Sequence, residues 1–336
     1  MKKGILLINL GTPNSPSVQD VRHYLDEFLM DERVIDINPI LRALLVKCVI
    51  VPFRAPASAK LYQQIWNTKT GSPLLHHSKL QQQLLKIALG DDYLVELAMR
   101  YQNPSIEMAL KKFQDNNINN IKIIPLFPQY ASATIGSVYQ KVMDVVSGWQ
   151  TIPQIDFAGS FHDHPLFITA LAQNGKKYQP ETYDHVLFSF HGLPQRQLKK
   201  CDNSGSHCLK KARCCEIFTQ KNSMCYSAQS YHTAKLIAAE LNIPADKYTV
   251  CFQSRLGKTP WIEPYTSDII GKLAKAGKKH IMVFCPAFVA DCLETIHEIG
   301  HEYREAFIAG GGEQLQLVES LNSSPLFIEL LKEMAV

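Results

Sequence analysis

Three glutamates, Glu294, Glu298 and Glu302, recur every four residues after an apolar run at residues 280–284. On a helix this spacing stacks the three carboxylates along one face. Exposed like charges repel each other by a few tenths of a kcal/mol per pair, roughly, so a compensating cation is expected. Carboxylates and the neighbouring imidazoles of His297 and His301 suit a hard or borderline divalent cation. The stripe therefore predicts a cation path, with a solvated acidic face as the alternative.

A second group of residues with metal chemistry lies in the segment of residues 196–226, called here the Cys-rich insert. This segment is rich in Lys, Ser and Asn, has no helical or strand period, and lacks the apolar residues needed to order itself. A metal-based staple is therefore expected. The insert holds five of the nine cysteines of the chain: Cys201, Cys208, Cys214, Cys215 and Cys225.

Four thiolates fit either a structural zinc site or an iron–sulfur cluster. The spacing of these cysteines lacks the paired C-x2-C knuckles of common zinc folds, which favours an iron–sulfur cluster. Reactive thiols without a ligand are the remaining alternative. The absence of a visible N-terminal export signal indicates a reducing compartment, so we predict a cytoplasmic protein.

Composition excludes several classes of protein. With 336 residues, 46% of them hydrophobic and 20% charged, the chain can bury a large core and form two domains. A formal net charge of +4 is too small and too scattered to indicate nucleic-acid binding. The apolar stretch at residues 40–53 is too short to span a membrane and contains Arg42 and Lys47. It predicts a buried helix or, alternatively, the apolar lip of a binding cleft that touches a membrane surface peripherally.

Strands and helices alternate along the chain. Helical periodicity at residues 18–29, 72–89, 105–113, 231–241 and 291–308 separates strand-like runs at residues 4–9, 93–99, 121–126, 154–157, 185–190, 248–253, 280–284 and 314–318. This order predicts an α/β fold with two doubly wound domains, each with a parallel sheet flanked by helices. We place the boundary near residues 150–162, giving domains 1–155 and 156–336, with the last helix free to pack back across it.

Residues able to do chemistry follow the strands, where ligands bind in such sheets. His191 ends the first strand of the second half, and Asp291 and Glu294 follow the third. An imidazole beside carboxylates can share proton transfer and metal delivery. Gly11 is not part of a dinucleotide fingerprint, since no G-x-G-x-x-G follows it.

Motifs along essentially the whole chain resemble those of the ferrochelatase family and occur in the same order. They are Leu10-Gly-Thr-Pro13, Tyr62-Gln-Gln-Ile-Trp66, Gly71-Ser-Pro-Leu-Leu75, Met99-Arg-Tyr101, Pro125-Leu-Phe-Pro-Gln-Tyr130, Thr134-Ile-Gly-Ser137, Ser189-Phe-His-Gly-Leu-Pro194, Gln253-Ser254, Pro260-Trp261 and Phe288-Val-Ala-Asp-Cys-Leu-Glu294. The resemblance implies two Rossmann-like domains (the chelatase fold) with a porphyrin cleft between them. It also implies insertion of Fe²⁺, the metal substrate, into a porphyrin during haem synthesis.

The resemblance also implies roles for single residues. His191 and Glu294 match the catalytic histidine and glutamate of the cleft, and Glu298 and Glu302 continue an acidic ladder toward solvent, so these four are the expected iron-contacting residues. Cys292 stands where some members have histidine. The expected substrate-binding positions are Asn9, Tyr130, Ser132, Trp261, Phe288 and Asp291.

The loop after the first strand and the Pro260-Trp261 region resemble proteobacterial enzymes, which favours protoporphyrin IX over coproporphyrin III. The insert resembles that of a bacterial subset with a [2Fe–2S] cluster, which implies Cys208, Cys214, Cys215 and Cys225 as ligands and Cys201 as the spare thiol. A tetrapyrrole or metal carrier without turnover, and a thiol redox enzyme, are the rival functions. The expected partners are porphyrin and Fe²⁺, in a monomer or homodimer, and no nucleic acid.

Overall fold

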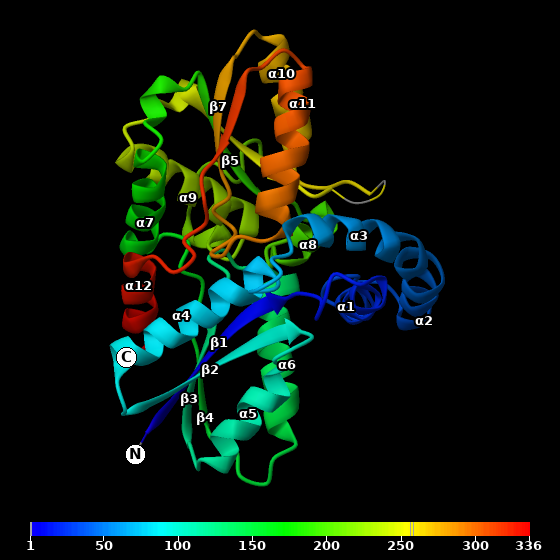
Figure 1. The fold of residues 1–336 in the computed structure, drawn as a ribbon, viewed down its shortest axis with the longest axis vertical. Coiled ribbons are helices and arrows are strands. Elements are labelled where there is room, and N and C mark those ends of the chain that lie inside the picture. Colours follow the sequence, from blue (N-terminus) through cyan, green and yellow to red (C-terminus); the bar gives the residue numbers. More distant parts are fainter. Residues whose placement is uncertain (1, 256, 258) are drawn as a thin grey trace. The chain divides into compact units, whose positions relative to one another are not determined.

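The computed structural model describes residues 2–255, 257 and 259–336, which form two four-stranded parallel sheets flanked by helices (Figure 1). This confirms the predicted α/β fold. The chain divides into two compact units. Unit 1 comprises the chain up to Phe127, Ala131–Ser160 and Ile328–Val336, and unit 2 comprises Pro128–Tyr130 and Phe161–Phe327.

The sheet of unit 1 has the strand order β2-β1-β3-β4. Its central strand β1 carries the run Ile5, Leu6, Leu7 and Ile8, which is fully buried because helices cover both faces of the sheet. The strands are β1 Lys3–Gly11, β2 Tyr93–Tyr101, β3 Asn120–Pro125 and β4 Gln154–Phe157. The main flanking α-helices are α1 Val18–Met30, α4 Pro73–Leu89, α5 Ile106–Asp115 and α6 Ser137–Ser147.

The sheet of unit 2 repeats this topology with the order β6-β5-β7-β8. Phe188 on β5 stacks on Phe284 of β7 with ring centroids 5.2 Å apart, and both side chains are buried. The strands are β5 His185–His191, β6 Tyr248–Gln253, β7 His280–Phe284 and β8 Gln314–Leu317. The helices are α7 Pro165–Lys176, α8 Gln195–Lys200, α9 Tyr226–Glu240, α10 Thr266–Lys275 and α11 Arg304–Ala309, with 3₁₀ turns η3 Pro180–Thr182, η4 Gln220–Asn222 and η5 Ala245–Lys247. The last helix, α12 Pro325–Ala335, begins in unit 2 and belongs from Ile328 onward to unit 1.

A π-helix follows the third strand of the chain order in each unit: η2 (Ser132–Gly136) after β3 and η6 (Leu293–Tyr303) after β7. The prediction of one α-helix over residues 291–308 is therefore wrong in helix type, because the first part is π-helical and α11 continues it. A pattern of apolar and charged residues does not distinguish these helix types over so short a segment. Single turns of π-helix are frequent at functional sites.

The apolar stretch at residues 40–53 does not form the buried helix that was one of its two predicted forms. It comprises α2 (Pro39–Leu44), the π-helix η1 (Leu45–Ile50) and the start of α3 (Val51–Ile65). Val46 and Val51 are buried, but the stretch also exposes a set of large apolar side chains: Ile40, Leu41, Leu44, Leu45, Val49 and Phe53. No helix among the described residues is both long enough and apolar enough to cross a bilayer.

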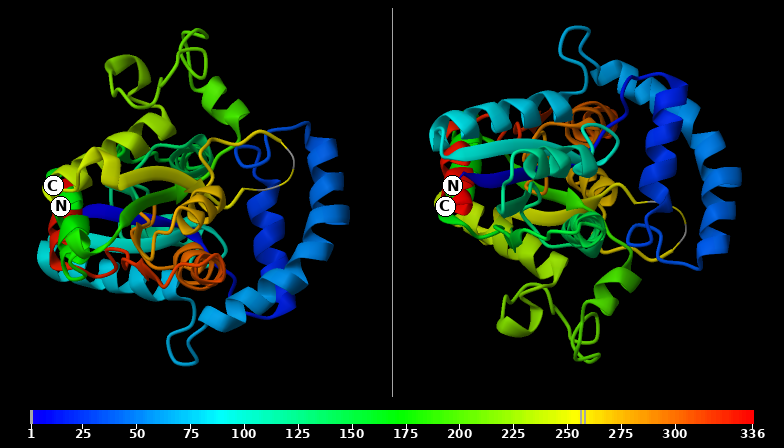
Figure 2. Two further views of the ribbon diagram at one scale, coloured as in Figure 1. Left: turned by 90° about the horizontal axis from the view of Figure 1, so that it is seen from above. Right: turned by 90° about the horizontal axis from the view of Figure 1, so that it is seen from below.

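Polar side chains organise the Cys-rich insert, which includes most of α8 and continues as projecting loops up to the start of α9 (Figure 2). Asp202 accepts hydrogen bonds from the backbone N–H groups of His207 and Cys208, both at 2.8 Å. Asn222 donates to the carbonyl oxygens of Cys214 and Ile217 at 2.9 and 2.8 Å. The predicted lack of apolar residues is therefore partly offset by side-chain hydrogen bonds to the backbone.

Candidate functional site

The candidate site is built on three neighbouring strand ends of unit 2. His191 ends β5 and lies in register with Gln253, which ends β6, while β7 leads into η6 with its carboxylates. The carboxyl ends of parallel strands meet at one edge of the sheet, where open α/β folds bind ligands. The topology therefore brings the predicted His191 and the glutamate helix to the same edge.

His191 is held by its own loop and by a tyrosine. Its Nδ1 lies 2.7 Å from the carbonyl oxygen of Gly192, so Nδ1 carries the proton in the neutral ring and Nε2 remains an acceptor. The Tyr226 hydroxyl donates to the His191 carbonyl oxygen at 2.9 Å, and the ring of Phe288 meets the imidazole edge-on at 6.4 Å. The geometry suits a proton acceptor with a fixed orientation.

Gln253 joins the strand of His191 to the glutamate helix. Its Oε1 accepts from the Ser189 hydroxyl at 2.7 Å, and its Nε2 donates to the Glu294 carbonyl oxygen at 3.0 Å and to Glu298 Oε2 at 3.1 Å. Its own carbonyl oxygen accepts from the Gly192 N–H at 2.8 Å. This buried amide therefore fixes the start of η6 against β5 and β6.

Glu298 accepts hydrogen bonds from three residues. Ser254 donates through its N–H at 2.8 Å and its hydroxyl at 2.5 Å, Tyr303 donates at 3.0 Å, and the Gln253 bond completes the set. Ser254 has φ 63°, a left-handed conformation that aims both donors at the carboxylate. Burial and the adjacent Glu298 raise the pKa of Tyr303, which keeps this donor protonated. Fixed hydrogen-bond donors therefore satisfy the carboxylate for which the sequence predicted a cation.

The other two carboxylates differ from Glu298 in their surroundings. Glu294 is half-buried in the first turn of η6, and Glu302 is exposed near its end. A π-helix has i→i+5 hydrogen bonds and is only slightly wider than an α-helix, so residues four apart remain on nearly the same face. Burial and then the Glu294 carboxylate raise the pKa of Cys292, so its thiol is a neutral hydrogen-bond donor to Glu294.

Two further predicted residues of unit 2, Asp291 and Trp261, differ in their hydrogen bonding. Both carboxylate oxygens of Asp291 are occupied, Oδ1 by the Thr295 hydroxyl and Ser320 N–H at 3.1 Å each and Oδ2 by the Asn322 amide at 2.7 Å. The Trp261 ring is buried, and its Nε1 has no hydrogen-bond partner among the described residues. A Cβ at Gly192 would lie 3.2 Å from that ring, so glycine permits the close approach.

Asn9, Ser132 and Tyr130 are fixed through polar contacts within their own units. In unit 1, Asn9 is buried and donates to the Ser78 hydroxyl at 3.0 Å, and the Ser132 hydroxyl accepts from Arg33 at 2.9 Å. In unit 2, the Tyr130 N–H donates to Gln229 at 2.6 Å.

Comparison with known proteins decides the family. A family model described as Ferrochelatase matches residues 2–336. The chain is 46% identical over 332 residues to a ferrochelatase of Legionella pneumophila strain Lens, covering 99% of this chain and 98% of the relative. It is 44% identical over 338 residues to a ferrochelatase of Coxiella burnetii strain Dugway 5J108-111, covering 99% and 93%.

The chain belongs to the ferrochelatase family. It is therefore an enzyme that inserts iron into porphyrin for haem synthesis, which confirms the predicted activity. Among solved structures, SirB from Bacillus subtilis with Fe³⁺ aligns with a TM-score of 0.53 at 13% identity, covering 100% of this chain and 96% of SirB. The sirohydrochlorin chelatase SirB of Bacillus subtilis subspecies spizizenii in complex with cobalt aligns at 0.52 and 12%, with the same coverage. At these identities the likeness concerns the fold alone.

Four cysteines of this ferrochelatase-family chain interact with one another. Cys214 Sγ lies 3.5 Å from Cys215 Sγ and accepts from the Leu209 N–H at 3.5 Å, and Cys215 hydrogen-bonds Cys225. Burial, followed by the nearby Cys225 and Cys214, raises the pKa of Cys208 to about 12. Cys201 is half-buried at the end of α8.

Cys225 connects this cysteine group to the candidate active site. It caps the N-terminus of α9 and directly precedes Tyr226, whose hydroxyl bonds the His191 carbonyl oxygen. The hydrogen bond from Cys215, together with the N–H groups of Ala228 and Ser227, lowers the pKa of Cys225 to about 7 despite burial. A thiol with a lowered pKa at a helix N-terminus is suited to bind metal as a thiolate.

Sequence reasoning named none of the residues that hold the glutamates as part of the site. Gln253 and Ser254 were noted as a family motif directly after a strand, and this position was the available signal for a role at the sheet edge. Tyr303 gave no signal, because a tyrosine on an amphipathic helix is most often a packing residue. Reasoning from the sequence also missed His162, Asp163 and His232, which approach one another in unit 2.

Proposed function

We propose that His191 is the base that takes pyrrole protons during iron insertion. Two N–H protons leave the porphyrin as Fe²⁺ enters, so the reaction needs a proton acceptor at the macrocycle. The observation that carries the proposal is the 2.7 Å contact between His191 Nδ1 and the Gly192 carbonyl oxygen, which leaves Nε2 as an acceptor. The Tyr226 bond to the His191 backbone supports a fixed orientation.

We infer that Glu294, Glu298 and Glu302 conduct Fe²⁺ toward the reaction site, with Glu294 contacting the metal at the end of the path. Carboxylate oxygens replace the water ligands of the incoming iron stepwise. The increase in burial from Glu302 to Glu294 supports this direction. Because Glu298 is satisfied by Ser254, Gln253 and Tyr303, iron would bind it by sharing oxygens already hydrogen-bonded, which makes it a weak, transient ligand.

We propose protoporphyrin IX as the porphyrin. Phe288 and Trp261 offer apolar ring surface, and Tyr130, Asp291, Asn9 and Ser132 are the further proposed substrate-binding residues. The indole Nε1 of Trp261, buried without a partner among the described residues, is available to a polar group of the substrate. Parallel anaerobic assays with protoporphyrin IX and coproporphyrin III test this choice, and a higher kcat/KM for coproporphyrin III would contradict it.

The cysteine group supports a [2Fe–2S] cluster held by Cys208, Cys214, Cys215 and Cys225. Such a cluster needs four thiolates, and these four thiols interact with one another in the structure. Both ring nitrogens of His207, beside Cys208, are buried without a hydrogen-bond partner among the described residues, which suits donation to cluster sulfur. When bound, the cluster would join four points of the insert and stabilise it next to Tyr226. Iron insertion transfers no electrons, so we assign a structural or sensing role.

The cluster assignment is tested on protein purified without oxygen. We expect a reddish-brown protein with about two iron and two sulfide per chain. Cys214→Ser should remove the colour and speed proteolysis within the insert, whereas Cys201→Ser should do neither. A colourless, active preparation with one zinc per chain would overturn the assignment and leave the ferrochelatase activity unaffected.

The exposed apolar side chains between Ile40 and Phe53 support an apolar lip with a peripheral membrane contact. Cosedimentation with anionic lipid vesicles should decrease in Phe53→Ser, which replaces a side chain that is 78% exposed. Met143→Ser replaces a 53% exposed side chain elsewhere in unit 1 and should cosediment like the wild type. Equal cosedimentation of all three proteins would contradict the contact.

The catalytic roles are tested by single-turnover iron insertion under anaerobic conditions. His191→Ala should lower the rate by about 10²–10⁴-fold, the range for a lost general base, while porphyrin binding measured by fluorescence persists. Glu294→Gln should be similarly impaired. His185→Gln, at the opposite end of β5, is the matched control and should keep the wild-type rate. Near wild-type turnover in His191→Ala would overturn the assignment of the base.

A further inference from the structure

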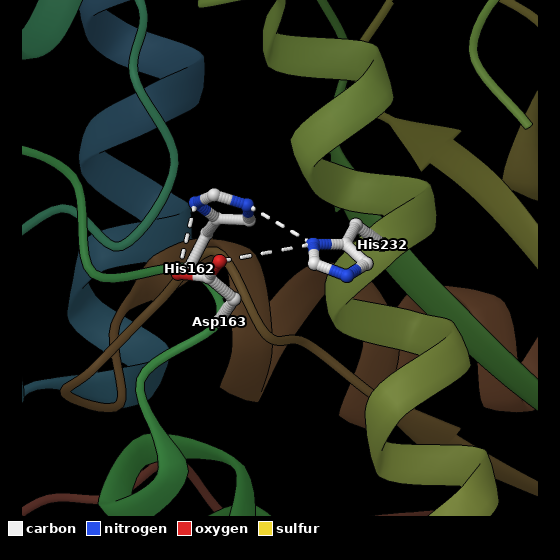
Figure 3. Close-up of side chains that lie close together, drawn as sticks. All are labelled: His162, Asp163 and His232. Atoms are coloured by element: carbon white, nitrogen blue, oxygen red, sulfur yellow. Dashed lines mark hydrogen bonds and ion pairs between the residues drawn. The ribbon is translucent and has the colours of Figure 1, made fainter. Parts of the chain in front are cut away.

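Two histidines that are 70 residues apart in the sequence, and an aspartate next to the first of them, converge in unit 2 (Figure 3). His162 and Asp163 lie between β4 and α7, and His232 lies on α9. One ligand atom from each residue lies within 4.8 Å of the other two. Figure 3 shows the His162 and His232 rings facing each other, with the Asp163 carboxylate beside both.

The distances suit a shared cation. His162 Nε2 lies 3.3 Å from His232 Nδ1. Two nitrogens bound at about 2.0–2.1 Å to a tetrahedral metal are themselves about 3.3–3.4 Å apart, so the two rings already have the spacing of neighbouring ligands. Asp163 Oδ2 lies 4.0 Å from His232 Nδ1, so the aspartate is within reach of the same cation as a third ligand.

The two imidazoles share a hydrogen bond, and His162 has one further ring nitrogen that is left unsatisfied. His162 is 5% exposed, and its Nδ1 is buried without a hydrogen-bond partner among the described residues. The backbone beside the ring is fixed, because the His162 carbonyl oxygen accepts from the Thr233 hydroxyl at 2.7 Å. Asp163 is about half exposed, which leaves a route from solvent to the site.

The imidazoles are also in the form that binds metal. Burial, countered by Asp163 and assisted by His232, lowers the pKa of His162 to about 4. Burial likewise lowers the pKa of His232. Both rings are therefore neutral near pH 7, so a cation would not have to displace a proton from a charged imidazolium.

We propose that His162, Asp163 and His232 form a binding site for a borderline divalent cation such as Zn²⁺, separate from the iron path on η6 and from the cysteine group. Two imidazoles and one carboxylate are typical ligands of such ions. Water reaching the site past Asp163 would complete a tetrahedral set.

The site has a structural connection to the Cys-rich insert. Phe218 of the insert stacks on the His232 ring with centroids 4.5 Å apart and planes 9° apart, and it also lies 5.2 Å from the His162 ring. A cation bound between the two imidazoles would fix the surface on which Phe218 rests. The cation would therefore stabilise the insert through the packing of Phe218. This support would be independent of thiolate ligation and of the chain connection at Tyr226.

The experiment measures Zn²⁺ binding to the complete protein, purified anaerobically, by isothermal titration calorimetry. Asp163→Asn keeps the shape of the side chain but weakens its ligand oxygen, and His232→Gln removes a partly exposed ring. The matched control is His280→Gln, another partly exposed histidine of unit 2 that lies 3.8 Å from a carboxylate, Glu313. Thermal melting without metal verifies that each variant is folded.

We expect the wild type and His280→Gln to bind one more Zn²⁺ per chain than His232→Gln, and Asp163→Asn to bind that ion about tenfold more weakly or worse. Zn²⁺ should slow proteolysis at Phe218 in the wild type and not in His232→Gln. Crystals soaked in Zn²⁺ should show an anomalous peak between the three side chains. Equal stoichiometry and affinity in all four proteins, or no peak there, would overturn the proposal.

Discussion

The two sheets of the molecule have the same strand order, but the polar residues near their strand ends differ in role. The central strand β1 ends at Gly11, and Gly192 directly follows the central strand β5; each glycine permits a close approach. A Cβ at Gly11 would lie 2.0 Å from the Tyr101 carbonyl oxygen, and one at Gly192 would lie 2.7 Å from the Gln253 carbonyl oxygen. Each third strand leads toward a π-helix, of five residues in unit 1 and eleven in unit 2. The backbone plan is therefore shared, and the side chains at these ends make the difference.

In unit 1 the polar groups near the strand ends satisfy one another. Asp31 Oδ2 accepts from Arg100 at 2.6 Å, from the Tyr101 hydroxyl at 2.8 Å and from the Ser137 hydroxyl at 2.5 Å. Thr12 donates to the Ser72 hydroxyl at 2.9 Å. A buried network with complete hydrogen bonding mainly specifies and stabilises the fold.

In unit 2 the carboxylates at the corresponding edge of the sheet differ in how fully they are hydrogen-bonded. Glu298 is bound by three residues, whereas Glu302 is exposed and Glu294 lies at the start of η6 with the neutral Cys292 thiol beside it. Excess acceptors at a sheet edge suit an incoming cation. Substitutions in unit 1 should therefore act mainly on stability, and those in unit 2 mainly on iron insertion.

The largest effect is expected at Asp31. Asp31→Ala leaves the Arg100 guanidinium without its carboxylate partner, and both side chains are largely buried at 6% and 15% exposure. Removing one partner of a buried ion pair costs about 3 kcal/mol of unfolding free energy. Urea denaturation measures this cost. Asp156→Ala is the control, because its pair with Lys122 is on the surface and should contribute less than about 1 kcal/mol.

Substitution of Gln253 should affect iron insertion more than stability. Gln253→Met keeps the volume of the side chain but removes its bonds to Ser189, Glu294 and Glu298. The start of η6 should shift, and kcat for iron insertion should fall about 30-fold, equivalent to about 2 kcal/mol, with little change in porphyrin affinity. Gln82→Met, which removes a single bond to the Val95 carbonyl oxygen in unit 1, should leave kcat unchanged. Equal kcat losses in both variants would contradict the positioning role.

The sequence predicted the strands well because most of them are apolar runs bounded by turn residues. β4, β6 and β7 begin and end at the predicted residues. Residues 40–53 were harder, because an apolar run does not show which of its side chains will lack a partner. Ile40 and Phe53 remain exposed, although their hydrophobicity is typical of core residues.

The site was predictable only as far as its residues carry a recognisable pattern. The four-residue repeat of Glu294, Glu298 and Glu302 is visible in the sequence, but two of the three residues that satisfy Glu298, Gln253 and Ser254, come from the end of a different strand. Such contacts depend on how β6 and β7 lie beside β5, which periodicity does not encode. The approach of His162 to His232 joins positions 70 residues apart and is hidden for the same reason.

The two outer carboxylates provide a finer test of the comparison. Glu298→Gln places an amide N–H₂ against existing donors, so it should lower kcat/KM for iron about tenfold and cost about 1–3 kcal/mol of stability. Glu302→Gln changes an exposed side chain and should raise KM for iron a few-fold at unchanged stability. Stopped-flow insertion and urea denaturation distinguish the two. A stability loss in Glu302→Gln larger than in Glu298→Gln would contradict the graded arrangement.

The smallest expected effect concerns Tyr101 in unit 1 and depends on pH. Burial, followed by the nearby Asp31 carboxylate, raises the pKa of Tyr101 well above 10, so the hydroxyl stays protonated in the folded protein. In the unfolded chain it ionises near pH 10, so its contribution to stability is complete below pH 10 and decreases as the pH rises above that value. Tyr101→Phe should cost about 1 kcal/mol at pH 8, the value of one hydrogen bond, and almost nothing near pH 11. Urea denaturation of both proteins between pH 8 and about pH 11 measures the difference, and a difference that stays constant over this range would show that the Tyr101 hydroxyl is not held protonated by its surroundings.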